Sequence, residues 1–95
     1  MEVNEHHFYV LVCRDGSYYA GYTNNLERRI KLHNEGKGAK YTRGRGPVRL
    51  IFSKSFPSKS EALKVEYHFK RWSRKKKDEF LLIETGGLYA AAKEL

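Results

Sequence analysis

Apolar and aromatic residues gather in two runs near the start of the chain, and each run predicts a strand. Residues 7–13 read His-Phe-Tyr-Val-Leu-Val-Cys, and residues 17–22 follow as the second run. Between them, Asp15-Gly16 is a strong signal for a tight turn. We therefore expect an antiparallel hairpin. Gly21 is unusual inside a strand and indicates that a ligand or another backbone approaches closely there.

The pattern then changes from that of a strand to that of a helix. Leu26, Ile30 and His33 recur at i, i+4 and i+7, the spacing of one helix face. Just before them, Asn24 and Glu27 have the spacing of a capping box, in which two side chains satisfy the free amides of the first turn. These residues predict a helix that ends near the glycine at position 36.

Glycines and basic residues fill positions 36–46, which predicts a loop. Its backbone amides and basic side chains suit phosphate groups, and the alternative is a flexible surface connection. Pro47 then opens a third strand, in which Arg49 and Ile51 alternate with an apolar set, Val48, Leu50 and Phe52.

Two further helices complete the chain. Ser58 and Glu61 form a second capping box, and the helix that follows runs to about Trp72. A basic helix extends over about residues 73–83 and ends before Gly86-Gly87. The order β-β-α-β-α-α predicts an α/β fold of the α+β type. We expect one domain over residues 1–95, with a small three-stranded, largely antiparallel sheet flanked by helices.

Positive charge is concentrated along this fold. The chain has 95 residues and a formal net charge of +8, with a pI near 9.7. Because such a chain repels itself, an anionic partner is favoured over a merely solvated surface, and nucleic acid over an acidic membrane. The basic residues form three clusters: Arg28, Arg29 and Lys31; Lys37, Lys40, Arg43, Arg45 and Arg49; Lys70, Arg71, Arg74, Lys75, Lys76 and Lys77.

Other features exclude several classes of protein. The single cysteine, Cys13, excludes an intrachain disulfide and a zinc site with several cysteines. No apolar run approaches the roughly 18 residues of a membrane span, and no signal peptide opens the chain. We expect a cytoplasmic monomer without a membrane partner.

Five positions in order resemble the GIY-YIG nucleases. The first motif triplet is His7-Phe8-Tyr9 and the second is Tyr19-Ala20-Gly21, ten residues from tyrosine to tyrosine. Arg29 and His33 follow at i, i+4 on the predicted helix, and Glu66 lies on a later helix. The resemblance covers about residues 7–72 and is greatest to the small stand-alone bacterial members. His7 and Ala20 stand where the family has glycine and isoleucine.

This resemblance implies a metal-dependent endonuclease that hydrolyses phosphodiester bonds. The residues implied as catalytic are Tyr9, Tyr19, Arg29, His33 and Glu66. Glu66 is implied as the ligand of one divalent cation, and oxygen ligation beside phosphates favours Mg²⁺ or Mn²⁺. Nucleic acid is the expected partner, with DNA favoured over RNA. The residues expected to bind it are Gly21, Lys37, Lys40, Arg43, Arg45, Lys70, Arg74, Lys75, Lys76 and Lys77.

The chemistry of these residue types agrees with that role. Hydrolysis needs an activated water and positive charge for the phosphate oxygens. A tyrosine serves as the base only if nearby positive charge, from Arg29 or a metal, lowers its pKa from about 10. His33 can move a proton or bind a phosphate oxygen. The alternatives are half-buried strand tyrosines, an ordinary helix histidine, and a Glu66 that merely pairs with Lys70 at i+4.

Two other functions stay open. Many active members of the family carry an asparagine near the end of the domain, and this chain has none after Asn34. A nucleic-acid-binding module with the same fold and little or no cleavage is therefore the main alternative. The second alternative is a protein-interaction domain whose basic surface meets an acidic partner.

Overall fold

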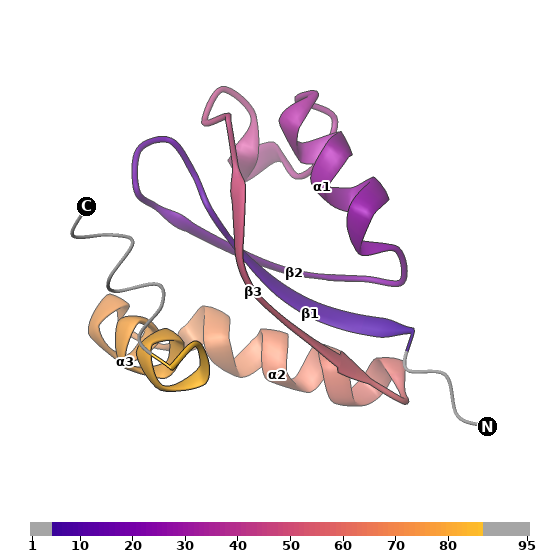
Figure 1. Cartoon of the computed structure of the whole chain (residues 1–95), viewed down its shortest axis with the longest axis vertical. Coiled ribbons are helices and arrows are strands. Elements are labelled where there is room, and N and C mark those ends of the chain that lie inside the picture. Colours follow the sequence, from indigo (N-terminus) through magenta and orange to yellow (C-terminus); the bar gives the residue numbers. More distant parts are fainter. Residues whose placement is uncertain (1–4, 87–95) are drawn as a thin grey trace.

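The structure is a computed structural model that describes residues 5–86, and its elements follow in the predicted order. Three antiparallel strands form one sheet, and helices flank it, so the α+β fold expected from the sequence is confirmed (Figure 1). The elements are β1 (His6–Val12), β2 (Tyr18–Thr23), α1 (Leu26–Asn34), the 3₁₀ helix η1 (Lys40–Thr42), β3 (Arg49–Phe56), α2 (Lys59–Arg71) and α3 (Arg74–Glu84). None of these helices is long and apolar enough to cross a membrane.

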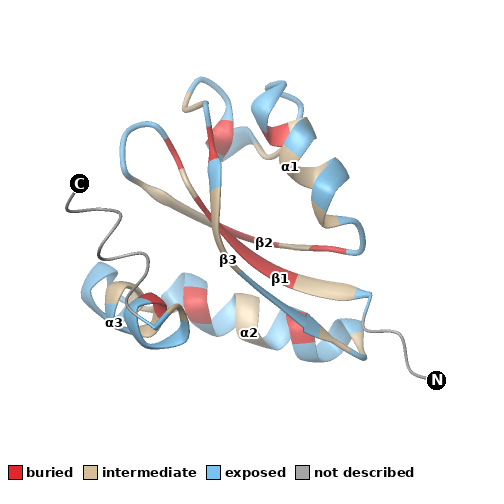
Figure 2. Cartoon of the chain, viewed as in Figure 1, coloured by how far each residue is buried: buried red, intermediate tan, exposed pale blue. Residues whose placement is uncertain are grey.

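The sheet has the strand order β2-β1-β3, with β1 in the centre. Tyr9 of β1 lies opposite Gly21 of β2, and Leu11 lies opposite Tyr19. The predicted hairpin of residues 7–13 and 17–22 is therefore confirmed in its pairing. Because β1 has a neighbour on each side and helices above and below, its middle is the most buried part of the sheet (Figure 2).

The two faces of the sheet carry separate apolar clusters. Helix α1 covers one face, while α2 and α3 cover the other (Figure 1). On the α1 face, the buried cluster includes Tyr9 and Leu11, with Ile30 packed against it. On the other face, the cluster includes Phe8 and Phe69. Burying both faces is what allows β1 to be apolar at consecutive positions.

A β-bulge breaks the alternation predicted for the third strand. Val10 lies opposite Phe52, and Leu11 lies opposite Leu50, so Ile51 is the extra residue between two paired positions. As a result, Ile51 and Phe52 both pack on the face of α2 and α3, while Leu50 packs on the α1 face. The expectation that Leu50 and Phe52 share a face was wrong, because alternation assumes one residue opposite each partner.

Helix α1 begins one residue later than the sequence predicts, while α2 begins where expected. Asn25, and not Asn24, caps α1, because its Oδ1 accepts a hydrogen bond from Arg28 N. The predicted cap of α2 at Ser58 is confirmed, and Glu61 bonds to the Ser58 hydroxyl in place of the Ser58 backbone N–H that a capping box uses. Glu61 N donates to Ser58 Oγ, and the Ser58 hydroxyl donates to the Glu61 carboxylate at 2.9 Å.

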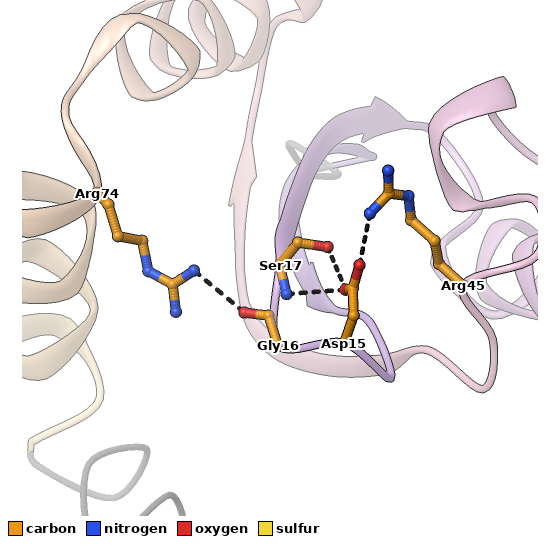
Figure 3. Close-up of polar contacts among 5 residues, drawn as sticks. All are labelled: Asp15, Gly16, Ser17, Arg45 and Arg74. Carbon is orange, nitrogen blue, oxygen red and sulfur yellow. Dashed lines mark hydrogen bonds and ion pairs between the residues drawn. The ribbon is translucent and has the colours of Figure 1, made fainter.

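Two arginines fasten the turn between β1 and β2 from opposite sides (Figure 3). Arg45, from the loop after η1, pairs with Asp15, whose other carboxylate oxygen accepts hydrogen bonds from Ser17. Arg74 of α3 donates to the Gly16 carbonyl at 3.1 Å. Both arginines were expected to bind nucleic acid, and a phosphate would have to compete with these internal partners.

Candidate active site

The α1 face of the sheet brings four of the five predicted catalytic residues together. Tyr9 and Tyr19 come from paired strands, with ring centroids 6.3 Å apart, and the ring centroids of Tyr19 and His33 are 5.1 Å apart. Tyr9 Oη lies 2.9 Å from His33 Nε2, and Arg29 Nε donates to Tyr9 Oη at 3.4 Å. Arg29 and His33 reach the same phenol because residues four apart share one face of α1.

Tyr9 is fully buried, and this controls its protonation. Burial raises the pKa of Tyr9 to about 12, outweighing the lowering effect of the hydrogen bond and charge of Arg29. The charge of Glu66 and the electrostatic interaction with Tyr19 act in the same direction as burial. Of the two possible sources of positive charge, Arg29 does lower the pKa of Tyr9, but by less than burial raises it, so Arg29 by itself does not make this phenol a base.

His33 is also buried, with 1% of its surface exposed. Burial, and secondly the positive charge of Arg29, lowers the pKa of His33 to about 4. The imidazole is therefore neutral at physiological pH, with one nitrogen that donates a hydrogen bond and one that accepts. Its Nδ1 lies 2.8 Å from Oγ1 of Thr42, a buried residue of η1.

The close approach predicted at Gly21 is real, but its neighbour is neither a ligand nor a backbone. A Cβ atom at Gly21 would lie 2.4 Å from Tyr9 Oη. Gly21 thus leaves room for the Tyr9 ring to lie across β2 toward His33. Its expected role in binding nucleic acid stays a prediction.

Glu66 lies on α2, which covers the face of the sheet opposite α1 (Figure 1). Its charge raises the pKa of Tyr9, and its partner Lys70 places Nζ 5.5 Å from the centroid of the Tyr19 ring. Glu66 Oε2 is 3.5 Å from Lys70 Nζ, and the Glu66 side chain is 18% exposed. The Glu66 carboxylate therefore pairs with Lys70, which is the alternative that the sequence left open.

The donors around Glu66 limit the kind of metal that the site can hold. Within residues 5–86, no group of three or more His, Cys, Asp or Glu side chains is arranged to hold a metal ion. A single carboxylate fits Mg²⁺ or Mn²⁺, which keep several waters and complete their shell with substrate phosphate oxygens. It does not fit zinc, which takes three or four protein ligands.

A hollow of about 250 Å³ opens beside the cluster at the edge of β2. Tyr19, Tyr41, Lys70 and Lys77 are among its lining residues. Tyr41 is 43% exposed, and its ring stacks on Tyr19 with centroids 6.1 Å apart. Aromatic rings beside lysines suit nucleic acid, whose bases stack and whose phosphates pair with ammonium groups.

The remaining basic residues expected to bind nucleic acid lie in two places. Lys37, Lys40 and Arg43 are exposed in the segment around η1, close in sequence to the buried Thr42. Lys75 and Lys76 are exposed on α3. The structure thus leaves basic side chains exposed both around η1 and on α3.

Two residues that hold the site were not anticipated from the sequence. Thr42 contacts His33, and Asn34 Oδ1 accepts a hydrogen bond of 2.8 Å from Val48 N, which ties the end of α1 to the start of β3. Neither contact has a signal in the sequence, because each joins residues nine or more positions apart through an irregular segment.

Comparisons with known proteins show which family and which solved structures this chain is similar to. Residues 5–79 match the family model described as the GIY-YIG catalytic domain. The chain is 60% identical over 81 residues to a UPF0213 protein of Bacillus licheniformis, covering 85% of this chain and 84% of that protein. It is 58% identical to the UPF0213 protein YazA of Bacillus subtilis, covering 85% and 82%. A solution NMR structure of a UPF0213 protein from Bacillus halodurans is similar with a TM-score of 0.61, 52% identity and 95% coverage of both chains.

Proposed function

The chain belongs to the GIY-YIG family, and on that basis we propose that it is a metal-dependent endonuclease that hydrolyses phosphodiester bonds in nucleic acid, with DNA as the favoured substrate. The observation that carries this proposal is the convergence of Tyr9, Tyr19, Arg29 and His33 within hydrogen-bond or ring-contact distance. General packing of a small domain does not require two phenols, an imidazole and a guanidinium in one place.

The four side chains differ in burial, and this difference indicates different roles. Tyr9 and His33 are sealed from solvent, so they orient and hold protons inside the site. Tyr19 and Arg29 are half-buried and can meet a substrate directly. Arg29 uses Nε to hold Tyr9, and a guanidinium has further N–H donors, which match the oxygens of a phosphate.

Glu66 is the residue that would hold the divalent cation. Such a cation, when bound, stabilises the negative charge that grows on the phosphate oxygens during cleavage. Glu66 would have to exchange its present partner, Lys70, for the cation, and Lys70 would then be available to a phosphate. Lys70 also lines the hollow beside Tyr19, so it is already placed at the substrate side of the site.

The test is a cleavage assay on labelled single-stranded, duplex, branched and flapped substrates, with Mg²⁺ or Mn²⁺ and with chelator. We expect metal-dependent cleavage that Arg29→Ala abolishes. The matched control is Arg28→Ala, which removes the same charge from an exposed position of α1. The control should weaken binding to a similar degree and retain cleavage. Equal loss of cleavage in both variants would show that Arg29 contributes only general charge.

One observation supports the alternative, a binding module without cleavage. Tyr9 is fully buried and its pKa is raised to about 12, so this phenol is a weak candidate for the base that activates water. The absence of an asparagine after Asn34 points the same way. Binding to the whole panel of substrates without cleavage of any, in either metal, would establish the binding module.

A further inference from the structure

The glycine-rich segment after α1 folds over the imidazole of His33. A Cβ atom at Gly38 would lie 2.3 Å from His33 Nδ1, so only glycine lets the backbone pass this close to the ring. Thr42, 1% exposed, then places Oγ1 2.8 Å from the same Nδ1. The segment that the sequence presents as a phosphate-binding loop is thus also the wall of the active site.

The hydrogen bonds of Thr42 determine which nitrogen of His33 carries the proton. A threonine hydroxyl has one proton to donate. Thr42 Oγ1 lies 3.0 Å from the carbonyl oxygen of Ala39, which can only accept, so the hydroxyl proton goes there. The 2.8 Å contact with His33 then requires that Nδ1 donates its proton to Oγ1. Ala39 N also points its hydrogen toward Nδ1, which would have to accept it, but this contact of 3.5 Å is at the outer limit of a hydrogen bond and is longer than the 2.8 Å contact with Thr42.

We infer that Thr42 is a positioning residue, which holds His33 in the Nδ1–H form and so makes Nε2 the acceptor for the Tyr9 hydroxyl. In this tautomer, each hydrogen bond from Arg29 to the Ala39 carbonyl pairs one donor with one acceptor. Arg29 Nε donates to Tyr9 Oη, Tyr9 donates to His33 Nε2, His33 Nδ1 donates to Thr42, and Thr42 donates to the Ala39 carbonyl.

This chain of donors explains how so polar a group can be buried. Within the described residues, every buried side-chain nitrogen and oxygen has a hydrogen-bond partner. With the opposite tautomer, Nδ1 would accept only the long 3.5 Å contact from Ala39 N, unless the Thr42 hydroxyl left the Ala39 carbonyl to donate to it. The Tyr9 hydroxyl would then accept from both Arg29 and His33, with its own proton pointing away from the cluster.

The tautomer can be read directly from two-bond ¹H–¹⁵N correlation spectra of the imidazole side chains at neutral pH. The unaltered chain and Thr42→Ser should show Nδ1–H. Thr42→Val cannot accept the Nδ1 proton, so its tautomer ratio should move toward Nε2–H by about tenfold or more. The control is Thr23→Val, which removes a buried hydroxyl that bonds to Asn25 and does not contact His33. Thr23→Val should lose stability without a change of tautomer.

Cleavage supplies a second readout, which rests on the proposed function. In Thr42→Val, kcat should fall on the order of tenfold to hundredfold with little change in KM, and Thr42→Ser should restore it. An Nε2–H form in the unaltered chain, or the same tautomer ratio in Thr42→Val as in the unaltered chain, would overturn the inference. If Thr42→Val does not fold, the spectra of the unaltered chain and of Thr42→Ser still decide. A chain with the expected tautomers that cuts nothing would overturn the nuclease proposal alone.

Discussion

The buried imidazole of His33 should make the folding stability of this chain sensitive to mild acid. Burial, with the positive charge of Arg29 as the second cause, lowers the pKa of His33 from 6.5 to about 4. Between these two values, the unfolded chain binds a proton that the folded chain does not. The contribution of neutral His33 to stability is therefore fully present above pH 6.5, and it is lost as the pH falls toward 4.

The size of this loss follows from the two pKa values of His33. One pKa unit corresponds to about 1.4 kcal/mol, so linkage predicts a loss of about 2 kcal/mol at pH 5 and about 3 kcal/mol at pH 4, relative to pH 7.5. A domain typically has roughly 5–15 kcal/mol of stability in total. The ring is 1% exposed, and Tyr9 of β1, Tyr19 of β2, Arg29 of α1 and Thr42 of η1 face it, so solvent does little to weaken the effect.

The assay is urea unfolding of the unaltered chain and of His33→Gln at several pH values between 7.5 and 4, followed by the fluorescence of Trp72. At pH 7.5 the unaltered chain should be the more stable, because glutamine cannot bond to both Tyr9 and Thr42 as the ring does. That margin should shrink by about 3 kcal/mol by pH 4. Taking the difference between the two proteins cancels the titration of the carboxyl groups that they share.

A matched control separates this effect from the removal of any histidine. His68 is exposed on α2, so His68→Gln should leave the pH dependence of stability parallel to that of the unaltered chain. A margin between His33→Gln and the unaltered chain that stays constant from pH 7.5 to 4 would refute the reasoning. It would mean that folded His33 takes up its proton as readily as the unfolded chain does.

Three further predictions concern the rest of the site. Gly21→Ala should destabilise the fold by roughly 1–3 kcal/mol in thermal unfolding, because the new methyl group meets the buried phenol of Tyr9; unchanged stability would show that the ring moves freely. Glu66→Gln should abolish metal-dependent cleavage and leave nucleic-acid binding intact or slightly stronger, whereas a purely structural ion pair predicts only a stability loss of about 0.3–0.5 kcal/mol. Changing the three lysines at positions 75–77 to glutamine should weaken binding similarly on unrelated sequences and flatten its salt dependence by up to about one unit per lost phosphate contact; unchanged affinity would remove α3 from the interface.

The sequence predicts most of this fold because the relevant signals are local. The hairpin turn at Asp15-Gly16 and the cap at Ser58 each lie within a few residues of what they determine. The bulge at Ile51 has no such signal, because it is defined by pairing with β1, about forty positions earlier in the chain. Alternation alone therefore places Phe52 on the wrong face of the sheet.

Local sequence patterns also predict only part of the candidate site. Helical spacing alone brings Arg29 and His33 to one face, and strand pairing brings Tyr19 to Tyr9. The protonation of Tyr9 could not be predicted, because it depends on how much solvent the fold removes, and that is a property of every element packed around the ring. The contact with Thr42 depends on the path of an irregular segment, which no periodic pattern specifies.

The distribution of charge explains how this site can be stable and still present charged groups near its surface. Tyr9 and His33 are neutral at physiological pH, so the sealed part of the site buries no charge and avoids the large cost of doing so. The charged candidates, Arg29 and Glu66, lie where side chains are only partly buried. A phosphate and a cation would thus meet the charged groups, Arg29 and Glu66. Tyr9 and His33 form a neutral layer beneath, which holds Arg29 in position through the hydrogen bond to Tyr9. Changes to the neutral layer should therefore alter stability first, and changes to the charged layer should alter binding and cleavage first.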